Sequence, residues 1–363
     1  MSEKVLLKGN EAFGEAAIRY GCRYYFGYPI TPQNEMTEYM AANLPKAGGS
    51  FVQAESELAA VNMAYGASVA GGRAMISSSS PGIALMQEGF SFMASAEVPC
   101  VVLNVSRGGP GIGSIQPGQA DYFQATRGGG NGDYRLIVLA PSSIQEATEI
   151  IGRAFDLADQ WRNPVLVLAD GVLGQMMEPV VLPEPIPALD EADIEKVKPW
   201  ALTGHKGTRP HNVIRSLHLI PETLEAYNQK LQKKYGEIQQ SLTEYEAFGL
   251  EDAEFVFVAY GSTARIVREA IELLAEEGIR AGLIRPITLW PYPYHAFDQL
   301  GDSVKQVISV ELSCGQMIDD VKIGVNGRFP VGFLGRSGGN LITPPEIVAA
   351  VKEKAAAGKG GNS

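Results

Sequence analysis

The stretch Gly27-Tyr28-Pro29-Ile30-Thr31-Pro32 follows an apolar run, Tyr24-Tyr25-Phe26, and two prolines bracket its threonine. Each proline restricts its own φ and disfavours the α region for the residue before it. Proline is common at the first position of a helix and threonine is a good N-cap, so we expect a strand that ends near Gly27 and a helix that begins at Pro32. The free amide groups of that helix start would lie beside the Thr31 hydroxyl, either as ligand-binding donors or only as a capped helix end.

Strands and helices alternate from Lys8 to about Pro179, which predicts a doubly wound, largely parallel α/β sheet. A second α/β unit begins near Glu251 and closes with a helix near the C-terminus. The residues between them form a proline-rich connector and a charged amphipathic helix at 222–248. We therefore predict domains at 1–180 and 251–355, a connector at 181–250 and a flexible tail at 356–363.

Composition and charge exclude several classes of protein. The net charge is −11 and no basic stripe offsets it, which argues against nucleic-acid binding. No apolar run has membrane-spanning length and the N-terminus does not resemble a signal peptide, so we expect a cytoplasmic protein that does not bind a membrane. We expect no metal site in this chain, because the spacing is too loose among the cysteines and histidines, Cys22, Cys100, Cys314, His205, His211 and His218.

The ends of the predicted strands carry the polar residues that are candidates for chemistry. In a doubly wound sheet the carboxyl ends of the strands lie along one rim, where ligands bind. Glu57 is an acid beside apolar neighbours, and Arg107 is a cation at a strand end that suits a carboxylate. The simpler interpretations are an exposed acid near a helix dipole and an ordinary loop arginine. An acid, an arginine and the Thr31 hydroxyl together suggest a small carboxylate substrate, but they do not identify the reaction.

A glycine-rich loop at 108–133 follows Arg107. Loops of this length inside a compact domain are usually functional or mobile. The loop does not fit GxGxxG before a helix and lacks the GK[ST] of a phosphate loop, so these modes of nucleotide binding are not expected.

Five stretches together resemble the alpha subunit of 2-oxoacid:ferredoxin oxidoreductases. They are GYPITP (27–32), ESELAAVNMAYGASVAGGRAM (55–75), SSSPGIALMQEG (78–89), SRGGPGIGSIQPGQADYFQATRGG (106–129) and VELSCGQM (310–317). The resemblance covers nearly the whole chain and is greatest for the branch that acts on branched-chain 2-oxoacids such as 2-ketoisovalerate. It implies a thiamine diphosphate pyrimidine-binding domain at 1–180 and a transketolase C-terminal-like domain at 251–355.

The resemblance also implies roles for single residues. Glu57 matches the glutamate that hydrogen-bonds N1′ of the cofactor's aminopyrimidine, Thr31 matches a substrate contact, and Arg107 matches the arginine that pairs with the substrate carboxylate. These three are the expected catalytic residues. The expected cofactor-binding residues are Tyr28, Pro29, Ile30, Thr31, Glu57, Ser79 and Ser80.

The family resemblance implies an oxidoreductase that is active only with partner subunits. No GDG followed by a suitably placed asparagine occurs, so a beta subunit is expected to hold Mg²⁺ and the diphosphate. Gamma and ferredoxin-like delta subunits would carry [4Fe-4S] clusters, coenzyme A would be the co-substrate and ferredoxin the electron acceptor, in a dimer of heteromers that serves anaerobic metabolism. The expected reaction is CoA-dependent oxidative decarboxylation of a branched-chain 2-oxoacid to acyl-CoA and CO₂.

Two alternatives to this reaction stay open. The first is the same reaction on 2-oxoglutarate, pyruvate or an aryl pyruvate. A second basic residue in the pocket, for which the loop offers Arg127, would favour a dicarboxylate. The second alternative is a non-catalytic assembly subunit, against which the joint presence of Thr31, Glu57 and Arg107 argues.

Overall fold

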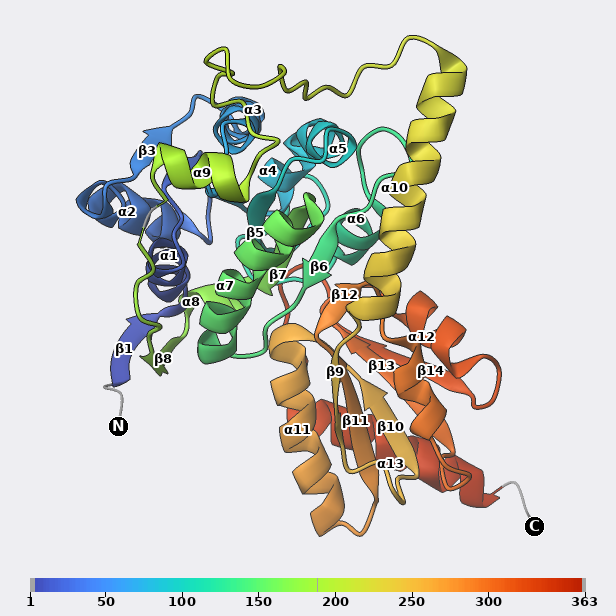
Figure 1. Cartoon of the computed structure of the whole chain (residues 1–363). Coiled ribbons are helices and arrows are strands. Elements are labelled where there is room, and N and C mark those ends of the chain that lie inside the picture. Colours follow the sequence, from blue (N-terminus) through green and yellow to red (C-terminus); the bar gives the residue numbers. More distant parts are fainter. Residues whose placement is uncertain (1–3, 188, 361–363) are drawn as a thin grey trace.

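The computed structural model describes residues 4–187 and 189–360 and shows two α/β units (Figure 1). The first unit is built on a seven-stranded sheet and the second on a five-stranded sheet. A long helix, α10 (Pro221–Ser241), lies along the side of the first unit and leads to the second. The predicted fold class, two α/β domains in succession, is confirmed.

The first sheet has seven strands, which are β2 (Tyr24–Gly27), β3 (Ser50–Gln53), β4 (Ala74–Ser78), β5 (Cys100–Ser106), β6 (Ile137–Leu139), β7 (Pro164–Asp170) and β12 (Thr288–Trp290). They lie in the order β12-β6-β7-β5-β4-β2-β3, and every neighbouring pair is parallel except β12 with β6. The strands β4, β5 and β7 are buried over their whole length. Burial on both faces explains why their sequences are nearly continuous apolar runs.

The helices of the first unit are α1 (Gly9–Arg19), α2 (Asn34–Asn43), the short 3₁₀ helix η1 (Pro45–Ala47), α3 (Glu57–Val69), α4 (Ser80–Leu85), α5 (Gln87–Ser95), α6 (Tyr122–Arg127), α7 (Ile144–Trp161) and α8 (Gly171–Gln175). Helix α1 packs against α2 and α7, and α3 packs against α4 and α5. Serine N-caps start α3 and α7: Ser56 accepts a hydrogen bond from the Ala59 amide at 3.2 Å, and Ser143 accepts one from the Glu146 amide at 3.1 Å. These caps satisfy amide groups that the first helical turn leaves free.

The second sheet has five strands, which are β9 (Tyr245–Phe248), β10 (Phe255–Val258), β11 (Ala281–Pro286), β13 (Gln306–Glu311) and β14 (Val331–Gly335). Their order is β14-β13-β10-β11-β9, and only the edge strand β9 is antiparallel to its neighbour. The helices of this unit are α11 (Gly261–Glu276), η2 (Tyr294–Gln299), α12 (Ile318–Val325) and α13 (Pro344–Gly360). The charged helix predicted at 222–248 therefore ends early, at Ser241, and its last residues form β9.

The two units are joined by one strand that crosses from one to the other and by a connector. Strand β12 follows β11 in the chain after a single residue, yet it pairs with β6 of the first sheet. The connector holds the short helix α9 (Glu191–Val197) and then irregular chain up to α10. At the N-terminus, β1 (Lys4–Lys8) pairs with β8 (Met177–Val181) in a small antiparallel sheet.

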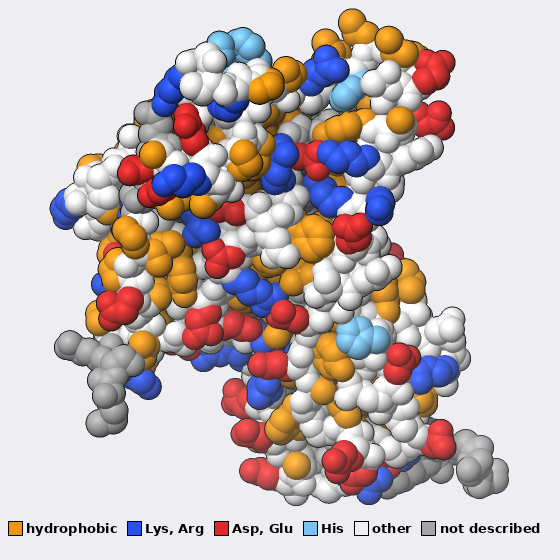
Figure 2. Space-filling model, viewed as in Figure 1, with side chains coloured by type: hydrophobic (Ala, Val, Ile, Leu, Met, Phe, Trp, Pro, Cys, Tyr) orange, Lys and Arg blue, Asp and Glu red, His pale blue; other side chains and the backbone are white. Residues whose placement is uncertain are grey.

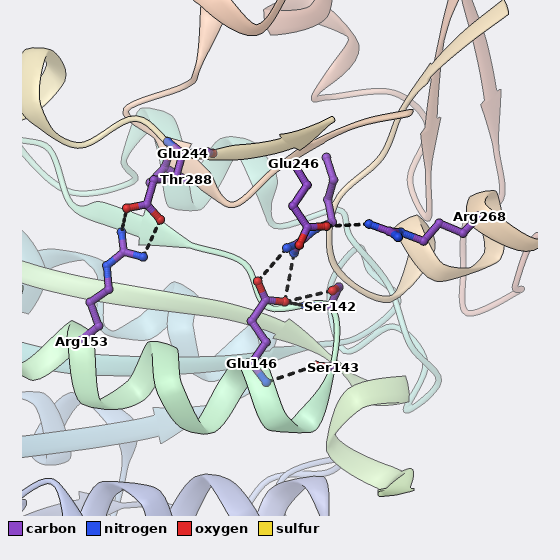
Figure 3. A network of polar contacts seen from close by, with 9 residues as sticks. Ser142, Ser143, Glu146, Arg153, Glu244, Glu246, Arg268 and Thr288 are labelled. Atoms are coloured by element: carbon purple, nitrogen blue, oxygen red, sulfur yellow. Dashed lines mark hydrogen bonds and ion pairs between the residues drawn. The ribbon is translucent and has the colours of Figure 1, made fainter. Parts of the chain in front are cut away.

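Ion pairs also hold the second unit against the first (Figure 3). The buried guanidinium of Arg285 donates two hydrogen bonds to Glu146 of α7, at 2.7 and 3.0 Å, and one to Glu246 of β9 at 3.0 Å. Arg153 of α7 donates two bonds to Glu244, at 2.5 and 2.6 Å. Paired bonds of this kind restrict orientation as well as distance, so they define how the second unit sits on α7.

The start of another predicted helix is also wrong. The helix expected to begin at Pro32 begins at Asn34. Helix α13 continues to Gly360, into the stretch predicted as a flexible tail at 356–363, and residues 361–363 lie outside the described residues. The flexibility of this stretch stays a prediction. Among the helices of the described ranges, none combines the length and the apolar character that a membrane span requires.

Candidate functional site

The strand order brings the predicted site residues to one rim of the first sheet. The strands β5, β4, β2 and β3 are consecutive neighbours and run parallel. Arg107 follows β5, Ser79 and Ser80 follow β4, the stretch 28–32 follows β2, and Glu57 comes shortly after β3. Parallel strands end at the same edge of a sheet, so this rim is the ligand-binding edge that the topology favours.

Arg107 links the rim to the Thr31 turn. Its side chain is buried, and Nη1 donates to the Thr31 carbonyl while Nη2 donates to the Ile112 carbonyl, both at 2.8 Å. Its Nε is buried and has no hydrogen-bond partner among the described residues. A guanidinium can donate five hydrogen bonds, so Arg107 keeps donors for a carboxylate while it is already held in place.

Helix α2 does not supply donors to Thr31 in the way that was predicted. The amide of Gln33 donates to the Ile30 carbonyl at 3.0 Å, so a turn separates Thr31 from the first helical residue, Asn34. Gln33, not Thr31, is the N-cap residue. The Thr31 hydroxyl instead accepts a long contact, 3.5 Å, from the Asn34 side-chain amide. The rigid stretch was predicted, but the capping role of Thr31 was not correct.

The turn is held from behind by two amide side chains. Asn10 of α1 and Gln175 of α8 each donate to the Pro32 carbonyl at 2.7 Å, and both also donate to Glu35. Burial by itself would raise the pKa of Glu35, but hydrogen bonds from Lys8, from its own backbone and from these two amides hold that pKa below its ordinary value. Glu35 is therefore ionised at neutral pH and keeps both amides aimed at the turn.

Ser80 and Asp121 extend this network along the rim. The Ser80 hydroxyl donates to Asp121 Oδ2 at 2.5 Å and accepts a hydrogen bond from the Arg107 amide at 3.0 Å. Asn104 Nδ2 donates to the same carboxylate oxygen at 2.8 Å. Sequence reasoning missed Asp121, because an acid in a glycine-rich loop gives no signal of its partners. Asp121 is the residue that ties the far end of the loop back to the rim.

Glu57 is the first residue of α3 and is buried with no protein partner. It is only 5% exposed, and neither a hydrogen bond nor an ion pair joins its carboxylate to another described residue. Neither oxygen of this carboxylate is among the fully enclosed side-chain atoms that lack a partner, so open space reaches the group. A ligand that presents a hydrogen-bonding nitrogen would satisfy the carboxylate, so Glu57 fits the role that the resemblance implies.

The serines beside Glu57 differ in their availability. Ser77 is engaged in the core, where Tyr25 Oη lies 2.5 Å from its hydroxyl and Gln33 Oε1 accepts from it at 2.6 Å. Ser79 is buried and its hydroxyl has no partner in the described chain. At the other side of the rim Tyr28 and Pro29 are exposed and Ile30 is half-buried. Those three residues face outward, where another molecule can contact them.

Gly82 makes room for the Glu57 carboxylate. A Cβ atom at Gly82 would lie 2.0 Å from Ser78 Oγ and 2.4 Å from Glu57 Oε1, far inside contact distance. We expect Gly82→Ala to displace the carboxylate and to lower activity on the order of 10²-fold, because a shift of about 1 Å in a reacting group has that effect. The measurement is the initial rate of the assembled enzyme. The control is Gly236→Ala in α10, where an added Cβ meets nothing within 4 Å; equal loss in both variants would contradict this steric role.

A cavity of about 530 Å³ adjoins Thr31 at the junction of the two units. Thr31, Glu35 and Gln175 line it from the first unit, Ile115 from the loop, and Leu341 from the second unit. The second unit therefore forms part of the wall beside Thr31.

Arg127 does not join the site network. Its Nη2 donates to Asp320 Oδ2 of α12 at 2.9 Å, and Asp320 also accepts hydrogen bonds from Tyr122 and Tyr294. Burial would lower the pKa of Arg127, but the charge and hydrogen bond of Asp320 raise it above the ordinary value. The guanidinium is thus committed to an ion pair with the second unit.

Comparison with known proteins identifies the protein family of each of the two units. Residues 15–247 match the family described as pyruvate flavodoxin/ferredoxin oxidoreductase, thiamine diphosphate-binding. Residues 253–347 match the pyruvate:ferredoxin oxidoreductase core domain II. The class is therefore a thiamine diphosphate-binding domain followed by the second α/β domain of an oxidoreductase.

Two curated relatives narrow that class. The ketoisovalerate oxidoreductase subunit VorB of Methanothermobacter thermautotrophicus is 46% identical, over 96% of this chain and 97% of its own length. The 2-oxoglutarate synthase subunit KorA of Methanocaldococcus jannaschii is 36% identical, over 95% of this chain and 98% of its own. The chain belongs to the family of 2-oxoacid:ferredoxin oxidoreductase subunits, as predicted, and these relatives are subunits of larger enzymes.

Solved structures agree with this assignment. The 2-oxoglutarate:ferredoxin oxidoreductase from Magnetococcus marinus, determined with 2-oxoglutarate, coenzyme A and succinyl-CoA bound, superposes with a TM-score of 0.82 at 30% identity. The match covers 97% of this chain and 65% of that one. A split-gene transketolase matches with a TM-score of 0.57 at 15% identity, which shows the likeness of fold alone.

Proposed function

We propose that this chain supplies the pyrimidine half-site and the substrate-binding arginine for CoA-dependent oxidative decarboxylation of a branched-chain 2-oxoacid. The observation that carries the proposal is the position of Glu57 on the same rim as the Arg107–Thr31 pair. Its side chain is largely buried, and its carboxylate has no hydrogen-bond or ion-pair partner among the described residues. The products would be an acyl-CoA and CO₂, with the electrons passed to ferredoxin. The similarity to a ketoisovalerate oxidoreductase subunit supports the substrate class.

The residues of the rim would have different roles in this reaction. When bound, thiamine diphosphate supplies the nucleophilic carbon that attacks the 2-oxo group and accepts the electron pair left by CO₂. Glu57 holds a proton at N1′ of the aminopyrimidine, as a positioned acid–base group does. Arg107 would pair with the substrate carboxylate through its free donors while its Nη1 stays bonded to the Thr31 carbonyl, and the Thr31 hydroxyl is the proposed substrate contact. Tyr28, Pro29, Ile30, Ser79 and Ser80 would border the pyrimidine.

The ion pair of Arg127 and the aliphatic side chains of the loop favour a monocarboxylate substrate with an aliphatic side chain. A dicarboxylate such as 2-oxoglutarate needs a second cation, and Arg127 is bound to Asp320 instead. The loop presents Ile112 and Ile115, whose side chains are 83% and 58% exposed. The Ile112 carbonyl accepts a hydrogen bond from Arg107, and Ile115 lines the cavity beside Thr31. Aliphatic side chains suit a branched substrate because apolar burial stabilises such contacts.

The proposal requires partner subunits. Relatives are named as subunits of multi-subunit oxidoreductases, and Tyr28 and Pro29 are exposed at the rim. We propose that a beta subunit covers this rim with the diphosphate and Mg²⁺. Gamma and ferredoxin-like delta subunits would carry [4Fe-4S] clusters to ferredoxin, in a dimer of heteromers. We also propose a cytoplasmic location, which the three unpaired thiols Cys22, Cys100 and Cys314 support.

A panel of 2-oxoacids on the co-purified complex tests the proposed function. The panel holds 3-methyl-2-oxobutanoate, pyruvate, phenylpyruvate and 2-oxoglutarate, with CoA and a viologen dye as acceptor. We expect kcat/KM for 3-methyl-2-oxobutanoate to exceed that for 2-oxoglutarate about 10²-fold or more, since a dicarboxylate would leave a charge unpaired. Preference for 2-oxoglutarate would refute the substrate class. No turnover of any oxoacid would favour the non-catalytic assembly subunit.

A further inference from the structure

Gln119, a residue of the glycine-rich loop, is hydrogen-bonded to the second unit through both its side chain and its backbone. It is 2% exposed. Its side chain donates to the Tyr260 carbonyl at 3.0 Å and accepts from Thr263 Oγ1 at 2.9 Å and from the Leu312 amide at 3.0 Å. Its backbone donates to the Leu312 carbonyl at 2.8 Å and accepts from Tyr260 Oη at 3.2 Å. Every one of these partners belongs to the second unit, at the ends of β10 and β13 and the start of α11.

The loop that Gln119 anchors folds back onto Arg107. Pro117 forms an isolated antiparallel bridge with Arg107, and the Gly108 amide donates to the Gln116 carbonyl at 2.8 Å. Gly118 lies so close that a Cβ atom there would be 2.9 Å from the Arg107 carbonyl carbon. The loop segment 116–118 therefore lies directly against the backbone of Arg107, and Gln119 follows this segment in the chain.

The same loop reaches the Arg107 guanidinium and the rim from its other end. The carbonyl of Ile112, a residue in the middle of the segment 108–117, accepts a hydrogen bond from Arg107 Nη2. Two residues beyond Gln119, Asp121 accepts from Ser80, which in turn accepts from the Arg107 amide. Arg107 is thus enclosed by chain segments that lie directly before Gln119. Further along the loop, Ala120 and Phe123 also bind the second unit, through hydrogen bonds with the Gln316 side chain.

We propose that Gln119 is a positioning residue for Arg107, through which the second unit holds the arginine ready for the substrate carboxylate. The proposal rests on the proposed role of Arg107. Without the Gln119 side chain the loop keeps its covalent ends but loses three of its hydrogen bonds to the second unit. The guanidinium would then sample several positions, and supporting contacts are what keep such a group within about 0.5 Å of its working geometry.

The test uses Gln119→Met in the assembled enzyme, because methionine has a similar shape but cannot form the three bonds. We expect KM for the 2-oxoacid to rise about 5- to 10-fold, kcat to change less than twofold, and KM for CoA to stay unchanged. The control is Arg153→Gln, which breaks the Arg153–Glu244 contact between the same two units elsewhere (Figure 3). An equal rise of the oxoacid KM in the control would show general loosening of the units and overturn the proposal.

A double-substitution cycle separates this inference from the function on which it rests. If Gln119 acts through Arg107, adding Gln119→Met to Arg107→Ala leaves KM as it is in Arg107→Ala alone. Multiplicative effects would overturn the positioning role. No effect of Arg107→Ala itself would refute the carboxylate role instead.

Two further measurements keep the proposal testable if Gln119→Met assembles poorly. Thr263→Val removes one of the three side-chain bonds at similar volume, and a smaller rise of the oxoacid KM is expected. Hydrogen exchange of the loop 108–117 should be faster in this variant than in Arg153→Gln. Exchange and KM that both match wild type would overturn the proposal.

Discussion

Replacement of Glu57 by Gln is expected to lower kcat for oxoacid-dependent dye reduction by about 10²–10⁴-fold, the usual contribution of a positioned acid–base group. The amide keeps the volume of the carboxylate but does not hold a proton at the cofactor nitrogen. Assembly should be unaffected, because Glu57 makes no hydrogen bond or ion pair within the described chain. The measurement is the initial rate of the purified complex at saturating oxoacid, CoA and thiamine diphosphate.

Glu55 provides a matched control for this substitution. It lies two residues earlier, at the same end of α3, but is exposed. Glu55→Gln should change kcat less than threefold, since an exposed acid near a helix start contributes only weak electrostatics. Near wild-type turnover of Glu57→Gln in an intact complex would refute the role assigned to Glu57.

The second large effect is expected from Arg107→Ala, which should raise KM for the oxoacid about 10- to 100-fold and change kcat much less. A hydrogen-bonded pair with a charged group contributes about 1.5–3 kcal/mol, and the substitution removes that pair from substrate binding. Steady-state rates over a wide range of oxoacid concentration measure the change. An unchanged KM would be incompatible with carboxylate binding by Arg107.

Arg127→Gln is the matched control for the arginine. Arg127 ends α6, close to the loop, but it is paired with Asp320. We expect its substitution to leave KM for 3-methyl-2-oxobutanoate within twofold. A large rise of KM for 2-oxoglutarate alone would show that Arg127 leaves its ion pair to bind a dicarboxylate.

Most of the strands could be predicted because the sequence of each strand is itself typical of a buried strand. Buried strands such as β5 and β7 are continuous apolar runs, and the helices between them have their own periodicity and caps. The strands β1 and β8 were missed and the pairing of β12 with the first sheet was not predicted, because each of these strands is short and is stabilised by pairing with a segment far away in the chain. Local pattern carries no information about such pairing.

The site was predictable to the extent that topology determines it. Glu57, Thr31 and Arg107 follow neighbouring parallel strands, so a single rule places them on one rim. The start of α2 was wrong because Gln33 turns back to Ile30 before the helix begins. Gln119 and Asp121 were not predicted, because their functions depend on partners 41 residues away in the case of Ser80 and 144 in the case of Thr263.

The position of β12 has a consequence for how this gene can be divided or rearranged. The strand is encoded after residue 280, yet it covers the edge of the first sheet. A fragment cut after residue 250 would expose the backbone of β6, and bare sheet edges recruit strands from other chains. Gene fission at the apparent domain border would therefore yield a self-associating N-terminal piece, whereas a circular permutant opened there would keep β12 in the same chain and could still cover β6.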